Sequence, residues 1–157
     1  IARDREGLRR AVNEAFVLGS GRVLVEEFIE IEKELECGYF ETKGKQLFTN
    51  VGEISVRGSF YDYKTKYIDS RAKISETASI NEEDEKTIRL YSSRLVDFLG
   101  LCGLSRIDYF QGKNKKIYFN EINTMPGFTE TSLYPRLAKS IGLTPAELVN
   151  RLVFDKI

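Results

Sequence analysis

The segment 119–129, Phe-Asn-Glu-Ile-Asn-Thr-Met-Pro-Gly-Phe-Thr, groups residues that can do chemistry, and a Ser-Arg-Ile-Asp stretch precedes it at 105–108. Side chains alternate between the two faces of a strand, so Arg106 shares a face with Asp108, and Glu121 with Asn123. If the hairpin loop between the two strands holds an even number of residues, both pairs fall on one face. Asp108, Glu121 and Asn123 would then converge.

Such a cluster predicts a metal site. Two carboxylates held about 4 Å apart repel by roughly 4 kcal/mol at an effective dielectric near 20, so they require a proton or a cation. The chain has no histidine, and oxygen ligands alone favour magnesium or manganese. Because magnesium completes its shell with water and nucleotide phosphate, ATP is the natural partner. The alternative is solvated strand acids with Arg106 in a surface salt bridge, which an isolated Arg-x-Asp would favour.

Three further positions could take part in chemistry. Gly127 permits a positive φ or a close backbone approach, and its amide beside Arg106 could hold an anionic tetrahedral centre; a plain turn is the alternative. Ser132 begins an expected helix, where a hydroxyl and free amides can bind a carboxylate or simply cap the helix. Lys66 lies in a long loop expected from Gly58 to about Thr77, where a lysine can meet a phosphate or remain a solvated charge.

Hydrophobic periodicity and turn residues predict the elements that position these side chains. Helices are expected over residues 6–18, with one core face, and over 81–99. Strands are expected over 23–29, 34–40 and 46–56, and a hairpin over 104–110 and 116–123 with a polar tip at 111–115. Two short helices follow near 132–141 and 144–154, the second opening with a Thr-Pro-Ala-Glu capping box.

Composition narrows the possible functions. The 157 residues include 24 basic and 24 acidic ones, so net charge favours neither nucleic acid nor a membrane as partner. There is no transmembrane run or signal-peptide core, so a soluble, cytoplasmic protein is expected, with Cys37 and Cys102 as reduced thiols. The lack of histidine excludes Ser-His and Cys-His nucleophiles and histidine-ligated zinc within this sequence.

Four motifs, in order along nearly the whole chain, resemble the C-terminal half of the D-alanine-D-alanine ligase family, members of the ATP-grasp superfamily. They are Val-Glu-Glu-Phe-Ile at 25–29, Phe-Tyr-Asp-Tyr-Lys-Thr-Lys-Tyr at 60–67, Ser-Arg-Ile-Asp at 105–108, and 120–129 with Ser-Leu-Tyr-Pro at 132–135. The resemblance implies an α+β fold, with a mainly antiparallel sheet and flanking helices. Residues 1–31 would be the end of the central lobe and the hinge, and 32–157 the C-terminal lobe. The N-terminal substrate domain and the phosphate loop would precede Ile1.

The resemblance also implies a role for each matching residue. Two Mg²⁺ ions, for which Mn²⁺ can substitute, would be held by Asp108, Glu121 and Asn123. Arg106 and the Gly127 amide would stabilise an oxyanion. The remaining roles concern ATP and substrate: adenine at Glu26, Glu27, Phe28 and Ile29, ribose at Glu34, the transferred phosphate at Lys66, the loop latch at Tyr67, and the second D-alanine at Ser132 and the Leu133 amide.

The implied reaction joins two D-alanine molecules through an acylphosphate, for peptidoglycan precursor synthesis, in a homodimeric enzyme. Two alternatives remain. One is a sister ligase that makes D-alanine-D-lactate or D-alanine-D-serine, although the Lys-Tyr pair at 66–67 resembles the dipeptide type. The other is an inactive nucleotide-binding fragment that depends on a partner chain.

Overall fold

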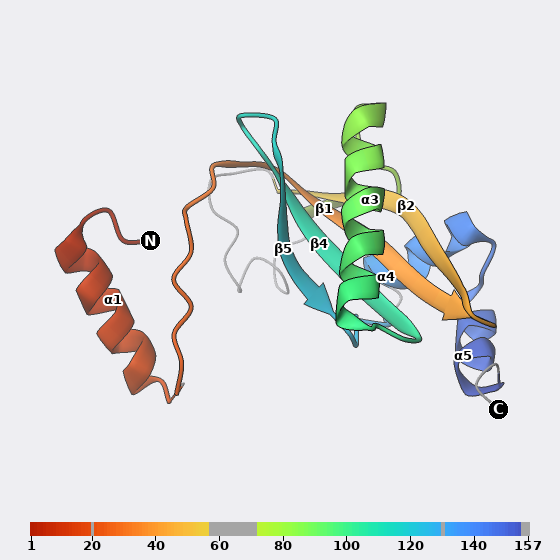
Figure 1. Cartoon of the computed structure of the whole chain (residues 1–157). Coiled ribbons are helices and arrows are strands. Elements are labelled where there is room, and N and C mark those ends of the chain that lie inside the picture. Colours follow the sequence, from red (N-terminus) through yellow and green to blue (C-terminus); the bar gives the residue numbers. More distant parts are fainter. Residues whose placement is uncertain (20, 57–71, 130, 155–157) are drawn as a thin grey trace. The chain divides into compact units, whose positions relative to one another are not determined.

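The computed structural model describes residues 1–19, 21–56, 72–129 and 131–154 (Figure 1). The chain divides into two compact units, Ile1–Glu30 and Ile31–Ile157. The second unit contains every described strand and most of the helical residues. Each unit is therefore described by itself.

The second unit is built on a five-stranded sheet with the order β3-β2-β1-β4-β5, in which every neighbouring pair is antiparallel. The strands are β1 (Ile31–Thr42), β2 (Lys45–Val56), β3 (Ala72–Ser75), β4 (Leu104–Gly112) and β5 (Ile117–Asn123). β1 lies at the centre, and its residues 35–40 are all buried. The expected strands at 34–40 and 46–56 and the expected hairpin are confirmed, as is the mainly antiparallel sheet.

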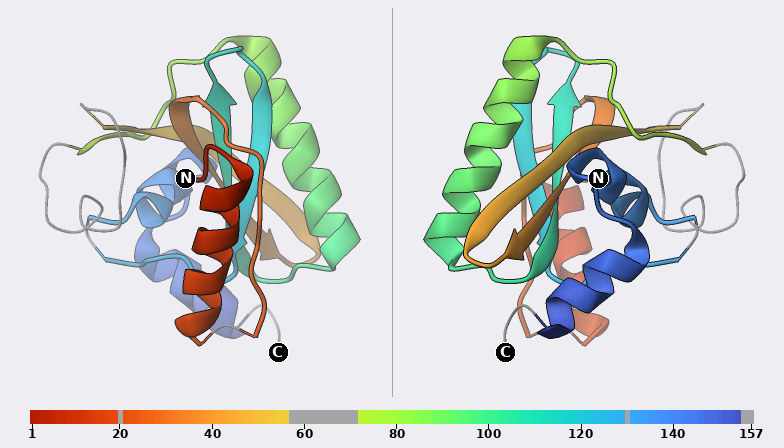
Figure 2. Two further views of the ribbon diagram at one scale, coloured as in Figure 1. Left: turned by 90° about the vertical axis from the view of Figure 1, so that its left-hand side faces the viewer. Right: turned by 90° about the vertical axis from the view of Figure 1, so that its right-hand side faces the viewer.

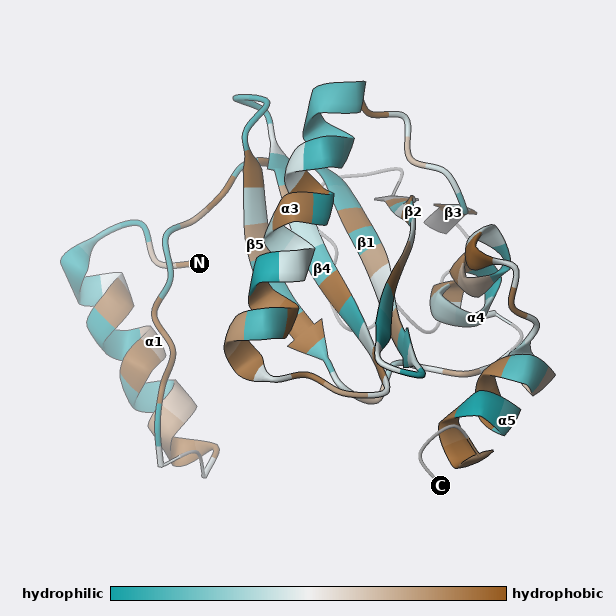
Figure 3. Ribbon diagram, turned by 45° about the vertical axis from the view of Figure 1, so that its right-hand side comes forward, coloured by the Kyte–Doolittle hydropathy of each residue, from teal (hydrophilic) through white to brown (hydrophobic). Residues whose placement is uncertain are grey.

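One face of the sheet packs against α3 (Glu82–Leu99), which crosses it diagonally (Figure 2). Asn81 caps the helix by accepting a hydrogen bond from the Asp84 amide, and Gly100 ends it in the left-handed conformation, as the sequence predicts. Ile88 and Val96 meet odd-numbered strand residues such as Ile107 and Tyr109, all buried. Burying one apolar side chain of this kind completely stabilises the fold by about 1.5–3 kcal/mol relative to leaving it exposed. Figure 3 shows hydrophobic positions recurring along α3, β1 and β4.

The opposite face carries α4 (Leu133–Leu137), the 3₁₀ turn η1 (Ala138–Ile141) and α5 (Pro145–Phe154). Phe40 of β1 packs there with Tyr134, Ala138 and Leu148, all buried. The capping box that opens α5 is present: Glu147 N donates to Thr144 Oγ1 (3.2 Å), and Thr144 N donates to Glu147 Oε2 (2.8 Å). The Glu147 carboxylate accepts hydrogen bonds from the Thr144 amide and from the Thr144 hydroxyl, and these two bonds lower its pKa.

The first unit differs from expectation in two respects. α1 (Arg5–Val17), capped by Asp4, confirms the helix, but none of its residues is buried and its apolar residues Leu8 and Phe16 are exposed. Residues 23–29 do not form the expected strand. A strand needs a neighbour for its backbone hydrogen bonds, and none of the described strands pairs with this segment.

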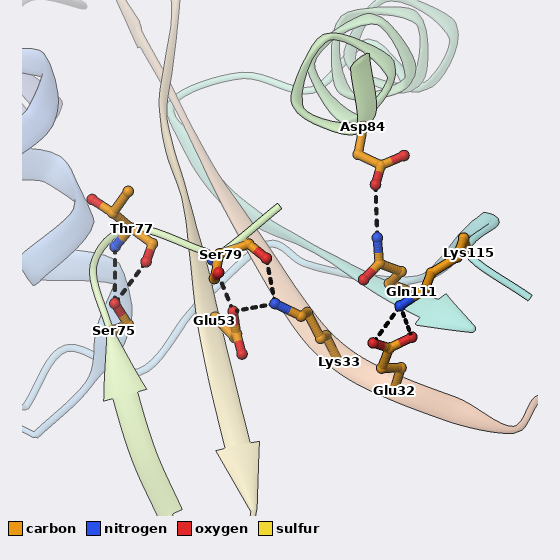
Figure 4. A network of polar contacts seen from close by, with 9 residues as sticks. All are labelled: Glu32, Lys33, Glu53, Ser75, Thr77, Ser79, Asp84, Gln111 and Lys115. Atoms are coloured by element: carbon orange, nitrogen blue, oxygen red, sulfur yellow. Dashed lines mark hydrogen bonds and ion pairs between the residues drawn. The ribbon is translucent and has the colours of Figure 1, made fainter. Parts of the chain in front are cut away.

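The loop expected from Gly58 to about Thr77 ends earlier than the sequence suggested, because β3 pairs with β2 through Ile74 and Ile54. Residues 57–71 lie outside the described residues. Polar contacts then fasten the segment that follows β3 (Figure 4): Lys33 Nζ donates to Glu53 Oε2 at 3.2 Å, and the Ser79 amide donates to the same oxygen at 2.9 Å. A weak local pattern became a strand because tertiary pairing was available to it.

Candidate functional site

Three carboxylates form a row across three adjacent strands, on the sheet face that carries α4. Glu36 of β1 is paired with Asp108 of β4, and Asp108 with Glu121 of β5. The next row holds Gly38, Arg106 and Asn123 in the same order. Directly opposed residues have Cβ atoms about 5 Å apart, so like charges in such a row destabilise the sheet unless a cation lies among them.

Arg106 supplies a positive charge to this acid row, defined as Glu36, Asp108 and Glu121. Its Nε and Nη2 donate to the two oxygens of Asp108, both at 2.7 Å, in a bidentate pair. Its Nε also lies 3.3 Å from Glu36 Oε2, as an ion pair. Burial lowers the pKa of Arg106, but the hydrogen bonds to Asp108 and the charges of all three acids outweigh it and raise that pKa above its ordinary value. The guanidinium is therefore held firmly in its charged form.

The hairpin reaches this register through a β-bulge. Its innermost strand pair is Gln111 with Ile117, which leaves an odd number of residues between them and would place Asn120 opposite Asp108. The register shifts between Asp108 and Tyr109, so Glu121 takes that position instead. The even loop on which the prediction depended is absent, and the bulge provides the same alignment.

The expected metal ligands carry the right donor atoms. Glu121 is exposed, and Asn123 Nδ2 donates to Glu121 Oε1 at 3.4 Å, so the amide lies beside the carboxylate. Among the described residues, no group of three or more His, Cys, Asp or Glu side chains is spaced to hold a metal ion. The expected set has two carboxylates and one amide, so water or phosphate oxygens would have to fill the remaining positions, as magnesium permits. Oxygen-only donors beside this acid row fit a magnesium ion.

Gly127 and Ser132 lie against each other after β5. A Cβ built on Gly127 would fall 2.9 Å from Ser132 Oγ, closer than real Cβ contacts. Gly127 is not among the residues with positive φ, so close approach rather than backbone conformation calls for glycine here. Ser132 Oγ accepts a hydrogen bond from Thr129 N (3.1 Å) and lies 2.9 Å from Thr129 Oγ1, and it makes no cap bond to α4. The simple N-cap alternative is therefore wrong.

The next residues fix this segment to the sheet. Leu133 is buried, and a Cβ built on Gly52 of β2 would fall 2.9 Å from Leu133 Cδ2. Tyr134 is buried too, and its hydroxyl donates to the Tyr39 carbonyl of β1 at 2.7 Å. Burial raises the pKa of Tyr134, so the hydroxyl remains a donor. Ser132 thus stands at the start of a helix anchored to the central strands.

The remaining expected site residues lie on other segments of the chain. Glu26, Glu27 and Phe28 are exposed and Ile29 is half-buried, in the non-strand segment of the first unit. Glu34 lies on β1 in the second unit, paired with Phe110. Lys66 and Tyr67 lie outside the described residues. The roles expected for all of them stay predictions.

Sequence reasoning missed Glu36, which is only 5% exposed. It lies 70 positions before Arg106, on a strand whose pairing with β4 no local pattern reveals. Two features of the sequence could have pointed to Glu36. It lies two positions after Glu34, so the two side chains share a strand face, and it is a charged residue inside an otherwise apolar strand.

An antiparallel sheet with helices on both faces also occurs in known proteins. The structure superposes on D-alanyl-alanine synthetase A from Vibrio cholerae with a TM-score of 0.79, at 32% identity over 96% of this chain and 47% of that one. It superposes equally well, with a TM-score of 0.79, on the VanG D-Ala:D-Ser ligase from Enterococcus faecalis, at 34% identity over 98% of this chain and 44% of that one. The fold is the C-terminal lobe of the ATP-grasp class.

Sequence comparison identifies the family within that class. The family model described as D-ala D-ala ligase C-terminus matches residues 1–154. A D-alanine--D-alanine ligase of Streptococcus equi subsp. zooepidemicus is 40% identical over 97% of this chain, and one of Bacillus cytotoxicus is 40% identical over 96%. The chain spans 43% and 41% of the lengths of these relatives. It belongs to the D-alanine-D-alanine ligase family, of which it represents the C-terminal part.

Proposed function

We propose that this chain is the C-terminal part of an ATP-dependent ligase that joins two D-alanine molecules for peptidoglycan precursor synthesis. The observation that carries the proposal is the acid row, paired with Arg106, together with the contact between Gly127 and Ser132 that follows β5. The acid row suits phosphate-bound cations, and the Gly127–Ser132 segment suits a small substrate carboxylate. Parts of the ligase beyond this chain, including the substrate domain and phosphate loop, would complete the site.

In this proposal the cluster holds charge and orients groups. Asp108, Glu121 and Asn123 would hold two magnesium ions, or manganese, whose chemistry is to neutralise the ATP phosphates. Arg106, kept charged by its carboxylate neighbours, would hold the oxyanion that forms when the amino group of the second D-alanine attacks the acylphosphate. The Gly127 amide would donate to the same oxygen. Catalysis of this kind needs orientation and water exclusion more than a strong base, so the lack of histidine is no obstacle.

Substrate contacts complete the assignment. Ser132 and the Leu133 amide would bind the carboxylate of the second D-alanine at the start of α4. Glu26, Glu27, Phe28 and Ile29 would receive adenine and Glu34 the ribose. Lys66 would meet the transferred phosphate and Tyr67 would latch its loop. The family also predicts a cytoplasmic homodimer, which light scattering on the complete natural polypeptide would test. No helix in the described part of the chain is long and apolar enough to cross a membrane.

A second candidate is a D-alanine-D-serine ligase. The solved relative with that name superposes as well as the D-alanyl-alanine synthetase does, so the fold does not separate the two activities. The Lys66–Tyr67 pair resembles the dipeptide type and speaks against D-lactate, but D-alanine-D-serine is also a dipeptide, so the pair does not separate D-serine from D-alanine.

The test is ADP release by the longest natural polypeptide that contains this chain, with Mg²⁺, ATP and either D-alanine, D-serine with D-alanine, or D-lactate with D-alanine. Release that depends on D-alanine alone supports the dipeptide ligase. Release only when D-serine or D-lactate is added identifies the sister activity. No release with any substrate contradicts the ligase proposal and favours a nucleotide-binding remnant.

A further inference from the structure

Glu36 is a buried charge at the site that no step of the proposed reaction uses. Its side chain is 7% exposed, against 18% for Arg106 and 13% for Asp108. It projects from β1 directly opposite Asp108, and its Oε2 lies 3.3 Å from Arg106 Nε. A carboxylate is seldom buried this deeply unless attraction to a partner offsets the free-energy cost of removing it from water.

Acids outnumber the arginine among the four described groups that meet here. Glu36, Asp108 and Glu121 supply three negative charges and Arg106 one positive charge, so these four groups carry a formal charge of 1 − 3 = −2. Like charges this close together in a partly buried site repel one another strongly. The arrangement therefore favours cations, but it also sets the cations in competition with Arg106 for the same carboxylates.

Asp108 is where that competition occurs. Both of its oxygens accept hydrogen bonds from Arg106. A cation that binds Asp108 draws on the same oxygens and repels the guanidinium. If Asp108 were the only anion holding Arg106, binding the cation would loosen the group that must face the developing oxyanion. Glu36 Oε2 contacts Arg106 as well, at 3.3 Å from Nε, and it does so from β1 and is not among the expected metal ligands.

We propose that Glu36 is a positioning residue, whose buried carboxylate keeps the Arg106 guanidinium in place while Asp108 binds a cation. This role rests on the proposed ligase function for its consequence in catalysis, and on the Glu36–Arg106 ion pair for its geometry. Asp108 can then serve as a metal ligand while Arg106 keeps a fixed counter-ion.

The kinetic test compares Glu36→Gln, which removes the charge and keeps the shape, with Glu36→Asp, which keeps the charge on a shorter side chain. The matched control is Glu53→Gln, because Glu53 is 15% exposed on the neighbouring strand and is paired with Lys33 away from the acid row. In the complete natural polypeptide, Glu36→Gln should lower kcat by about tenfold or more, which corresponds to ~1.4 kcal/mol. KM for ATP should change little, because Arg106 acts on the transition state.

The half-saturating Mg²⁺ concentration should also rise in Glu36→Gln, because the row loses one negative charge and Asp108 becomes the main counter-ion of Arg106. Glu36→Asp should recover part of both effects. Glu53→Gln should change neither kcat nor the Mg²⁺ requirement.

A second readout does not depend on turnover. An arginine-selective dicarbonyl reagent attacks the neutral guanidine, so carboxylates that hold the protonated form slow its reaction. Peptide mass spectrometry would follow labelling of Arg106 with and without Mg²⁺. Glu36→Gln should label several-fold faster than wild type and faster still with Mg²⁺, whereas Glu53→Gln should label at the wild-type rate.

The outcomes separate this role from the ligase proposal. If wild type shows no D-alanine-dependent ADP release but Glu36→Gln speeds labelling, the ligase proposal fails and the anchoring of Arg106 stands. Unchanged labelling in Glu36→Gln overturns the positioning role, whatever happens to kcat. Faster labelling with wild-type kcat in an active ligase also overturns it, because Arg106 would then need no second anchor for catalysis.

Discussion

Replacing Gly127 by alanine tests the contact on which the substrate half of the proposed site depends. The added Cβ would fall 2.9 Å from Ser132 Oγ and 3.7 Å from Ser132 Cβ. Only the first distance is a clash, so the Ser132 hydroxyl has to move. Doing so breaks its hydrogen bond from Thr129 N and its contact with Thr129 Oγ1. At about 0.5–1.5 kcal/mol for each hydrogen bond, the cost is roughly 1–3 kcal/mol.

If Ser132 binds the carboxylate of the second D-alanine, that cost should appear in the KM for this substrate. A loss of 1–3 kcal/mol corresponds to a rise of about 5- to 150-fold, since each ~1.4 kcal/mol is tenfold. ATP affinity should be spared, because the clash lies on the substrate side. Steady-state ADP release at varied D-alanine and varied ATP, on the complete natural polypeptide, measures both.

The decisive control is the same substitution in a Ser132→Ala background. Ser132→Ala alone should weaken D-alanine binding and spare ATP affinity. Gly127→Ala should then cost little more, because the atom it would strike is gone and the remaining Cβ–Cβ distance is ordinary contact. Any backbone effect of replacing glycine is present in both backgrounds and cancels in the cycle. An equal penalty for Gly127→Ala in both backgrounds would refute the proposed contact, and so would no penalty in wild type.

Three further outcomes are expected. Glu121→Gln should lose Mg²⁺-dependent turnover by about tenfold or more while the melting temperature stays near that of wild type, because the exposed carboxylate is replaced by an amide of the same shape; near-normal turnover would count against the metal assignment. Iodoacetamide at pH 8 should label Cys102 and spare native Cys37, because Cys102 is exposed and burial raises the pKa of Cys37 to about 11; peptide mass spectrometry reads the result. Thr144→Ala should lower the melting temperature by a few degrees and flatten its acid dependence, because the capping hydrogen bonds lower the pKa of Glu147. The wild-type advantage is therefore full above the unfolded carboxyl pKa and disappears as pH falls through the folded value.

Local patterns predicted much of this fold. The helix from Glu82 to Leu99 carries its own start and stop signals, with Asn81 as N-cap and Gly100 in the left-handed conformation. The hairpin of β4 and β5 is bounded by polar turn residues, and its two strands are close in sequence. Such elements need little from the rest of the chain, so periodicity and turn chemistry are enough to find them.

The errors concern features that depend on distant partners. The segment 23–29 has a strand-like composition, but no described strand pairs with it, while β3 is short and exists through its pairing with β2. The alignment of Asp108 with Glu121 depends on a bulge near Asn120 that the loop length would not suggest. Glu36 joins the site only because β1 lies beside β4, and a single sequence does not encode strand order locally.

β1 links the two halves of the site through Glu36, Gly38 and Tyr39. Glu36 belongs to the acid row, and the Tyr39 carbonyl accepts the hydrogen bond from the Tyr134 hydroxyl at 2.7 Å. Between them, Gly38 stands opposite Arg106, and a Cβ there would meet Thr49 Cγ2 at 2.8 Å and the Tyr134 ring at 3.1 Å. Any side chain at Gly38 would have to push Tyr134, and with it the start of α4, away from the strand that carries Glu36. The spacing between the groups proposed to bind the oxyanion and the substrate carboxylate is therefore set by the buried packing of the central strand.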